Sequence, residues 1–573
     1  MEWHAPGAQA WQQAKERGVP VVLLLEAEWC PLSRRFREGA LADPAVRSLL
    51  LEHFVSIRAD AGSEPELDAR FGSSGWPTLA WIDPEGNLLE RSGPRDAAAL
   101  RTLLERWRDR SPMASEPDAG SRARFASISR EVMERLLASA DPKFGGWGTR
   151  QKFPHPEALH FALVRWSREG DRATLQLVNH TLQYMQAGAI HDRVEGGFFR
   201  YARTADWSEP HYQKMLGSNA QRLLAYAEAY QALGTESFRE TALGIQAWME
   251  HSLLDPATGA FRASQDEDAE YYHLPTREAR IRRKPPETDP WIYTDRNGDA
   301  VCALLKAGLA LGREDFLEQA LTTLDFLVTQ LYRPGRGVAH GFDGMPKQSG
   351  FLKDQAALLR ALTWAMHYVG SRRYMGTALE LAEHTLHAYG AGLPSAQRPK
   401  DGSLADRLHD IQERGSLGER PESLEANAML AEGLLRLSYM ADRPDLRRAA
   451  ETILQAFAND WPRFGNGIAG YGRAVDLCVH EPVQITIVGS REDDATRALR
   501  RSALAPYIAS RVVQTLNPVE DADFLQRSGW PLPDGERQAV AYLHQAGQSY
   551  GRTSDPASLP ALMIRLGRSG QQS

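Results

Sequence analysis

The sequence has few cysteines and no excess of positive charge, and both absences exclude classes of protein. Only three cysteines occur among 573 residues, Cys30, Cys302 and Cys478, which is too few for a disulfide framework or a cysteine-rich zinc site. Lys and Arg number 67 against 74 Asp and Glu, so the formal charge is -7 and no general positive field attracts a nucleic-acid backbone. We therefore expect no nucleic-acid partner. Gly489 is not followed by the second and third glycines of a dinucleotide site, and the histidines and acidic residues lack a metal-ligand spacing, so we also expect no cofactor and no metal.

Long apolar segments are also missing. The longest aliphatic run, residues 19–25, is interrupted by Pro20 and ends at Glu26, far short of the roughly 20 residues that span a bilayer. The first residues do not combine a basic start, an apolar core and a small-residue cleavage site, which is the pattern of an export signal. The expectation is a cytoplasmic protein with no membrane partner.

The first 110 residues alternate between short apolar runs and amphipathic stretches. The pattern predicts helices over 8–17, 32–41, 44–52 and 97–108, and strands over 19–25, 54–59, 78–82 and 87–91. This order is typical of a compact α/β domain over residues 1–110. Residues 111–121, rich in Pro, Ser and acidic side chains, are interpreted as a linker.

The remaining chain changes to long Ala- and Leu-rich stretches with helical spacing. Paired helices joined by Gly- and aromatic-rich loops predict stacked hairpins over residues 122–465. Because no repeat of fixed period is visible, a closed ring of irregular hairpins is favoured over an open solenoid. Residues 466–573 return to an α/β pattern, with strands at 483–488 and 511–516 around a helix at 494–503, and predict a small segment packed on the helical body.

Cys30 is the strongest candidate nucleophile. Trp29 and Cys30 follow a buried strand and open a helix, and Pro77 precedes the next strand, as in a thioredoxin-like fold with a cis proline beside the thiol. A thiol at a helix N-terminus has a lowered pKa. Ser33 stands where a second cysteine would resolve a mixed disulfide, so dithiol exchange is disfavoured. A monothiol role with glutathione or a thiol-bearing protein remains open, as does a packing module with an incidental cysteine.

Several loops at helix entrances combine aromatic rings, forked or charged donors and carboxylates. Flat rings beside hydrogen-bonding groups suit a polyhydroxylated ligand such as a sugar, and paired carboxylates can act as general acid and base. Taken singly, the same residues can form tight turns, plug the core or cap helices. The histidines and acidic residues show no fixed metal-ligand spacing. The candidate ligand contacts are Lys152, Asp192, Arg200, Tyr201, Asp206, Trp207, Lys214 and Asn297.

The motifs of these loops resemble those of the spermatogenesis-associated protein 20 family along nearly the whole chain. The resemblance rests on Lys-Phe-Pro at 152–154, on Gly-Gly-Phe at 196–198 with Arg-Tyr at 200–201, on Pro-His-x-x-Lys-Met at 210–215, on 266–270 and on Asn-Gly at 297–298. It implies a thioredoxin-like domain followed by a six-hairpin (α/α)6 barrel with a small α/β C-terminal segment. This sequence departs from the family pattern at Ser33, Gln213 and Ser218, which replace a cysteine, a glutamate and an aspartate.

The leading hypothesis is a barrel that binds or acts on a carbohydrate-like small molecule, with His211 and one of Asp266 and Asp268 as the proton-transfer candidates. If catalytic, it would resemble an epimerase or a hydrolase, by analogy of fold alone. Gln213 cannot ionise, so hydrolysis that uses this position should fail. The alternatives are a monothiol redox or protein-quality role at Cys30 and a non-catalytic binding scaffold.

Overall fold

The computed structural model describes most of the chain and divides it into two compact units. The described residues are 3–27, 31–72, 76–83, 86, 88–108, 125–393, 399, 402–408, 422–527, 539–545 and 548–569. One unit comprises residues 1–120, 393–398 and 405–422, and the other comprises 121–392, 399–404 and 423–573. Trp29 and Cys30 of the predicted thiol motif lie outside the described residues.

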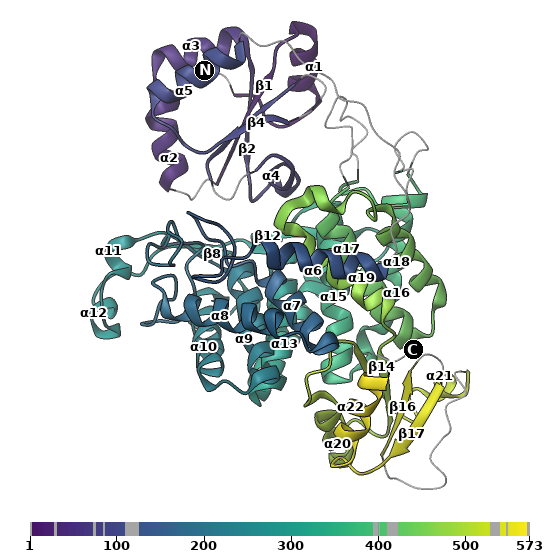
Figure 1. Ribbon diagram of the computed structural model, residues 1–573. Helices are drawn as coiled ribbons and strands as arrows, with labels where there is room; N and C mark the ends of the chain where they lie inside the picture. The colour runs from purple at the N-terminus through teal and green to yellow at the C-terminus, as the bar shows by residue number, and fades with distance from the viewer. Residues whose placement is uncertain are drawn as a thin grey trace. The chain divides into compact units, whose positions relative to one another are not determined.

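The N-terminal unit is built on a four-stranded sheet in the order β2-β1-β3-β4 (Figure 1). Strand β1 (Val21–Glu26) pairs in parallel with β2 (Val55–Asp60) and antiparallel with β3 (Thr78–Ile82). Strand β4 (Leu88–Ser92) completes a hairpin with β3. Every residue of β1 and β3 is buried, which explains why both strands are near-continuous apolar runs.

Helices cover both faces of this sheet. Side chains of α1 (Ala8–Arg17) and α4 (Pro65–Phe71) pack on one face. Those of α2 (Pro31–Glu38), α3 (Pro44–His53) and α5 (Ala97–Arg108) pack on the other. This is the thioredoxin-like arrangement that the sequence predicts, although the short helix α4, which begins with Pro65, was not predicted.

The second unit contains six inner helices that form a closed ring. Each contacts the next in the order α7, α9, α13, α15, α17, α19 and back to α7. Four of them have 18 residues and end at a residue in the left-handed conformation, which is glycine in three cases and Asp442 in the fourth. The bounds are α7 (Pro156–Glu169), α9 (Leu216–Leu233), α13 (Thr294–Leu311), α15 (Leu352–Val369), α17 (Leu424–Ala441) and α19 (Ala469–Val479).

Outer helices pair with the inner ones to complete six hairpins. Their bounds are α6 (Phe125–Ser139), α8 (Arg172–Ala187), α10 (Glu236–Trp248), α14 (Glu314–Phe326), α16 (Met375–Leu386) and α18 (Pro444–Ala456). The sixth hairpin joins α6, which follows the linker, to α19, so the two ends of the helical region close the ring. The (α/α)6 barrel thus extends past residue 465, where the change in sequence texture placed its end. No helix in the described part of the chain is long and apolar enough to cross a membrane.

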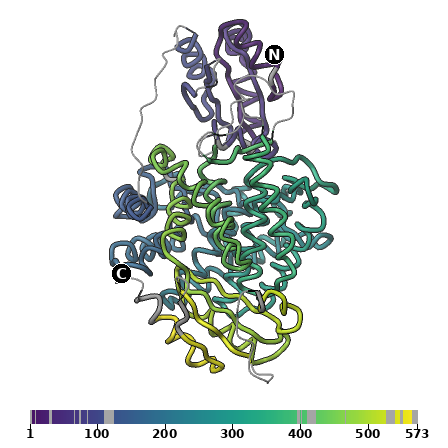
Figure 2. The backbone as a smooth tube through the Cα atoms, turned by 90° about the vertical axis from the view of Figure 1, so that its right-hand side faces the viewer, coloured from purple at the N-terminus to yellow at the C-terminus, as the bar shows by residue number. Residues whose placement is uncertain are grey.

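The C-terminal segment closes one end of the barrel. Its sheet has the order β15-β14-β16-β17, from β14 (Val483–Val488), β15 (Arg511–Leu516), β16 (Val540–Gln545) and β17 (Gln548–Thr553). The sheet is flanked by α20 (Asp494–Leu504), α21 (Ala522–Arg527) and α22 (Leu559–Ser569). The backbone N–H of Val513 donates to Nδ1 of His367, near the C-terminal end of α15, at 3.0 Å. The views in Figures 1 and 2 both show this segment, in yellow, across one end of the helices.

The opposite end of the barrel carries the loops that precede the inner helices. These loops form short strands, including β5 (Lys214–Met215), β8 (Ser264–Gln265) and β9 (Thr288–Asp289) in one small sheet. A second sheet contains β10 (Ile292–Tyr293), β11 (Tyr332–Arg333), β12 (Gly337–Phe342) and β13 (Pro346–Ser349). Because the C-terminal segment covers the other end, we call this end the mouth of the barrel.

Candidate functional site

Four buried amide side chains attach the mouth loops to the inner helices. Each is the fourth residue of its helix, and the four are Asn219, Asn297, Gln355 and Asn427. Asn297 accepts the N–H of Phe261 at 2.8 Å and donates to the carbonyls of Phe261 and Tyr293 at 2.9 and 3.0 Å. The other three repeat this pattern on the backbones of Phe198, Val338 and Leu404. We call these residues the amide clamps. Asn297, predicted as a ligand contact, is thus bonded to backbone.

The loop before α9 folds back on itself and brings His211 beside Tyr201. The backbone N–H of His211 donates to the backbone carbonyl of Tyr201 at 2.9 Å, and the backbone N–H of Arg200 donates to the backbone carbonyl of Gln213 at 2.8 Å. The Tyr201 ring then lies between Phe153 and the His211 imidazole, with centroids 4.9 and 5.0 Å away. Three flat groups therefore stack in one row.

Charged groups surround this row. His211 Nε2 lies 3.6 Å from Glu267 Oε2, and Arg203 reaches the same carboxylate at 3.6 Å. Arg200 Nη1 donates to Gln213 Oε1 at 3.3 Å. We refer to Arg200, Tyr201, His211, Gln213 and Glu267 as the His211 cluster.

Two polar atoms of the His211 cluster have no hydrogen-bond partner within the described residues. They are Nδ1 of His211 and Nε2 of Gln213, on side chains that are 3% and 1% exposed. Buried polar atoms in native proteins are nearly always hydrogen-bonded, and leaving one unpaired costs about 1–3 kcal/mol. His211 Nδ1 and Gln213 Nε2 are therefore candidates for hydrogen bonds to a ligand or to ordered water.

The His211 imidazole is uncharged at neutral pH because it is buried. Burial, with additional repulsion from Arg200 and Arg203, lowers the pKa of His211 to about 3. The imidazole is therefore neutral near pH 7 and offers one donor and one acceptor. Burial also raises the pKa of Tyr201, so its hydroxyl stays protonated.

Asp192 and Lys214 form a separate, buried ionic network. Asp192 Oδ2 lies 2.6 Å from both Lys214 Nζ and Arg280 Nη1, and Arg280 also reaches Glu195 at 3.0 Å. The Lys214 ammonium is fully buried, and burial lowers its pKa even beside Asp192. Burial opposes ionisation of Asp192 as well, but its two cationic partners hold its pKa below the usual value. Both side chains are therefore occupied by partners in the protein.

The remaining predicted ligand contacts are also bonded within the protein. Lys152 is fully buried, 2.5 Å from Asp141 Oδ2 and 5.3 Å from the Trp207 ring. Trp207 is buried and donates from Nε1 to the Phe144 carbonyl at 2.9 Å. Asp206 lies in an exposed turn and accepts hydrogen bonds from the residue two positions on.

The two acidic candidates after β8 stabilise local backbone. Asp266 Oδ1 accepts the N–H of Glu267 at 2.8 Å. Asp268 caps the short helix α11 (Ala269–Tyr272) by accepting the Tyr271 N–H at 2.9 Å. Glu267, the residue between them that sequence reasoning passed over, is the carboxylate nearest to His211.

A second feature missed from the sequence is a polar network across the barrel axis. It contains one side chain from each inner helix, Glu157, Gln221, Asp299, Arg360, Glu432 and Arg473. Arg473 binds Glu157 and lies 2.8 Å from Glu432, while Arg360 binds Asp299, which accepts from Gln221 at 3.1 Å. Burial raises the pKa of Asp299 to about 6, although Arg360 opposes the shift. Charged residues in helices usually face solvent, so sequence alone gave no sign of this interior placement.

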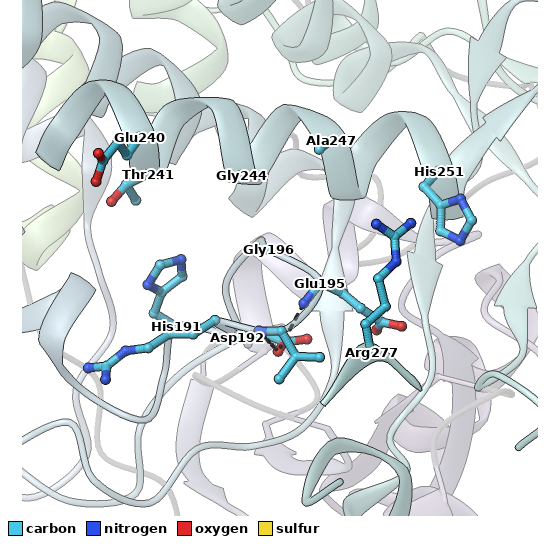
Figure 3. A pocket seen from close by; sticks show the side chains of 12 residues that line it. His191, Asp192, Glu195, Gly196, Glu240, Thr241, Gly244, Ala247, His251 and Arg277 are labelled. Atoms are coloured by element: carbon cyan, nitrogen blue, oxygen red, sulfur yellow. Dashed lines mark hydrogen bonds between the residues drawn. The ribbon is translucent and has the colours of Figure 1, made fainter. Parts of the chain in front are cut away.

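A surface cavity of about 400 Å³ lies between α10 and residues 191–196. Figure 3 shows Glu240 and Thr241 along α10 at one end and His251 and Arg277 at the other. Because α10 is an outer helix, this cavity lies outside the ring of inner helices, and none of its lining residues belongs to the His211 cluster.

The described neighbours of the thiol motif retain thioredoxin-like features. The Trp76–Pro77 bond is cis, as predicted. The Ser33 side chain is fully buried, and its hydroxyl has no hydrogen-bond partner in the described residues. Glu26, at the end of β1, is buried and pairs with Arg58 and with Arg37, the latter at 3.2 Å. Burial raises the pKa of Glu26 despite both arginines.

Comparison with known families and curated proteins matches both units. A thioredoxin-like family matches residues 2–84. Spermatogenesis-associated protein 20 from Homo sapiens is 23% identical over 98% of this chain and 90% of its own length. The protein of the same name from Rattus norvegicus is 23% identical over 98% of this chain and 89% of its own.

Two solved structures of epimerases are similar to part of this chain. A sugar epimerase from a ruminal bacterium has a TM-score of 0.48 and 14% identity, and covers 61% of this chain and 98% of its own. The cellobiose 2-epimerase from Spirochaeta thermophila has a TM-score of 0.48 and 15% identity, and covers 62% of this chain and 98% of its own.

Proposed function

The chain is a relative of spermatogenesis-associated protein 20 along nearly its whole length, and we propose that its barrel binds a carbohydrate-like small molecule at the His211 cluster. The observation that carries the proposal is the pair of buried, unpartnered atoms, His211 Nδ1 and Gln213 Nε2. Both can bond to a hydroxyl group, which donates one hydrogen bond and accepts two.

The aromatic row supports a ligand with a flat, weakly polar face. The rings of Phe153 and Tyr201 and the neutral imidazole of His211 are stacked. The C–H face of a pyranose packs on an open ring face while its hydroxyls bond at the edge, and in this row only the end rings, Phe153 and His211, have a face that Tyr201 does not cover. At that edge Arg200 and Arg203 supply donors and Glu267 supplies an acceptor, and both Arg203 and Glu267 retain solvent exposure.

The electrostatics favour binding over proton transfer by His211. General-base catalysis works best when the pKa of the base lies near the working pH. With its pKa near 3, His211 is a weak base at neutral pH, and its role in this proposal is to exchange hydrogen bonds. If the site is catalytic, Glu267 is the adjacent group that can move a proton, and Gln213 remains a neutral donor.

The test is ligand binding by the full chain and by matched variants. Monosaccharides, disaccharides and sugar phosphates are screened by thermal shift, and each sugar that stabilises the protein is titrated by calorimetry. Specific binding raises the melting temperature further as ligand excess grows. His211→Ala and Gln213→Leu should each weaken binding at least tenfold, whereas His211→Asn, which keeps a donor and an acceptor, should lose less. His387→Ala, at an exposed histidine on another hairpin, is the control. Sugar binding that is unchanged in both His211→Ala and Gln213→Leu, or no binding by any sugar, refutes the proposal.

A monothiol role is a second candidate for the N-terminal unit, favoured by the match of residues 2–84 to a thioredoxin-like family and by Ser33, which stands where a second cysteine would resolve a mixed disulfide. Alkylation of Cys30 as a function of pH measures its pKa. A pKa near that of free cysteine, with no glutathione mixed disulfide, removes this candidate.

A further inference from the structure

Three potential metal ligands from distant parts of the sequence meet at the mouth of the barrel. They are Asp295 in the first turn of α13, His340 on β12 and Asp354 in the first turn of α15. One ligand atom from each lies within 4.8 Å of the other two. His340 Nδ1 is 3.0 Å from Asp354 Oδ2 and 3.2 Å from Oδ1.

The surroundings hold these groups in place. His340 and Asp354 are 3% and 1% exposed, whereas Asp295 is half-buried. The rings of Tyr293 and Phe351 each lie 5.1 Å from the His340 imidazole and restrict its rotation. Asp295 keeps a small exposed fraction, 12% of its side chain, while the other two ligands are held in place.

The spacing of the three ligand atoms is compatible with a bound metal ion. Around a metal with bonds of about 2.1 Å, adjacent octahedral ligand atoms lie roughly 3.0 Å apart and opposite ones roughly 4.2 Å. His340 and Asp354 have the adjacent spacing, which is also that of a hydrogen bond, and an Asp295 oxygen lies within 4.8 Å of both ligand atoms. An Asp–His hydrogen bond requires no second carboxylate, whereas one imidazole with two carboxylates is a ligand set for divalent transition metals.

Two cationic side chains of the protein, Lys353 and Arg296, already lie beside the carboxylate of Asp295. Lys353 Nζ lies 3.7 Å from Asp295 Oδ2 and 3.1 Å from Glu425 Oε1, and Arg296 Nε lies 3.9 Å from Asp295 Oδ1. A metal ion would therefore compete with the Lys353 ammonium for Asp295, while Lys353 keeps Glu425 as its partner. This competition makes a distinctive prediction about Lys353.

We propose that Asp295, His340 and Asp354 bind a divalent transition-metal ion, such as Mn²⁺ or Zn²⁺, at the mouth of the barrel. The ion joins the first turns of α13 and α15 to strand β12. The site shares no residue with the His211 cluster, so its test does not depend on sugar binding.

The experiment measures metal uptake by the full chain after treatment with EDTA. Calorimetric titration with MnCl₂ and ZnCl₂, followed by elemental analysis after gel filtration, should give one bound ion per chain, and the ion should raise the melting temperature. Asp354→Asn and His340→Gln should each weaken binding at least tenfold. Lys353→Met removes the competing ammonium and should tighten binding.

Two controls separate ligation from folding. His160 and Glu228 form another buried histidine–carboxylate pair, 2.7 Å apart, so His160→Gln should leave uptake unchanged. Melting curves of all variants in EDTA report their folding without metal. Lack of uptake at millimolar metal, or uptake that is the same in Asp354→Asn, His340→Gln and the parent, overturns the proposal. Weaker uptake by Lys353→Met overturns it as well, because the ammonium would then not be a competitor.

Discussion

Replacing one amide clamp should measure how strongly the mouth loops are attached to the barrel. Asn297→Ala removes three hydrogen bonds of 2.8–3.0 Å and leaves the N–H of Phe261 and two carbonyls to find new partners in a buried place. At about 1 kcal/mol for each net bond, plus the cost of groups left unpaired, the loss is roughly 3–5 kcal/mol. The helical unit contains about 430 residues, and near 2.1 cal/mol/K per residue that loss lowers the melting temperature by roughly 3–6 °C.

Differential scanning calorimetry of the full chain checks this value, and Asn297→Asp refines it. An ionised carboxylate can accept the Phe261 N–H but cannot donate to the two carbonyls, so Asn297→Asp should destabilise at least as much as Asn297→Ala at neutral pH. It should recover partly at low pH, where the carboxyl protonates and donates again. Gln183→Ala, at an exposed amide on α8, is the control and should change the melting temperature little. A shift below 1 °C for Asn297→Ala would refute the view that the clamp bonds stabilise the fold.

Two further predictions concern buried ionisable groups. Asp192→Asn should lower the free energy of unfolding by about 3 kcal/mol, because it leaves the buried Lys214 ammonium without its carboxylate. Urea unfolding measures the change. The control is Glu236→Gln, which breaks an exposed ion pair and should lower the free energy of unfolding by less than about 0.5 kcal/mol. His211, whose pKa falls from 6.5 in an ordinary setting to about 3 in the fold, binds fewer protons when folded, so stability must drop as the pH falls below 6.5 towards 3. In His211→Asn this contribution to the pH dependence should be absent, so between pH 6.5 and 5 its free energy of unfolding should fall by about 2 kcal/mol less than that of the parent protein. If the free energy of unfolding has the same slope against pH in both proteins, the depressed pKa of His211 is contradicted.

The predicted helices and strands agree with the structure where proline, glycine and apolar spacing mark their ends. The helices at 8–17 and 97–108 and the strands at 78–82 and 483–488 have the bounds that the sequence predicts. Helix α19 was missed because Gly470 and Gly472 interrupt its pattern, and Gly472 is required where a side chain would collide with Val132 at 2.7 Å. Such contacts exist only after the ring has closed.

The residues of the candidate site were harder to predict because their partners are distant in sequence. Arg200, Tyr201 and His211, which belong to two separate motifs in the sequence, lie in one loop of the structure, and their mutual contacts run within that loop. Asp192, by contrast, is satisfied by Arg280, a residue 88 positions away. The sequence does not distinguish a polar residue that bonds to a distant protein partner from one that binds a ligand. The fold distinguishes them, because it shows which side chains are in contact.

The amide clamps also explain why the barrel shows no fixed sequence period although its hairpins repeat. The four clamps are separated by 78, 58 and 72 residues, so the conserved feature of the architecture is a position within each helix and the lengths of the loops between helices vary. Candidate functional groups follow soon after the clamped backbone. Tyr201 lies three residues after Phe198, and His340 lies two residues after Val338. A clamp fixes one backbone position inside each loop and the residue just before the helix, and the few residues after the first of these can carry different chemistry on the same helical ring.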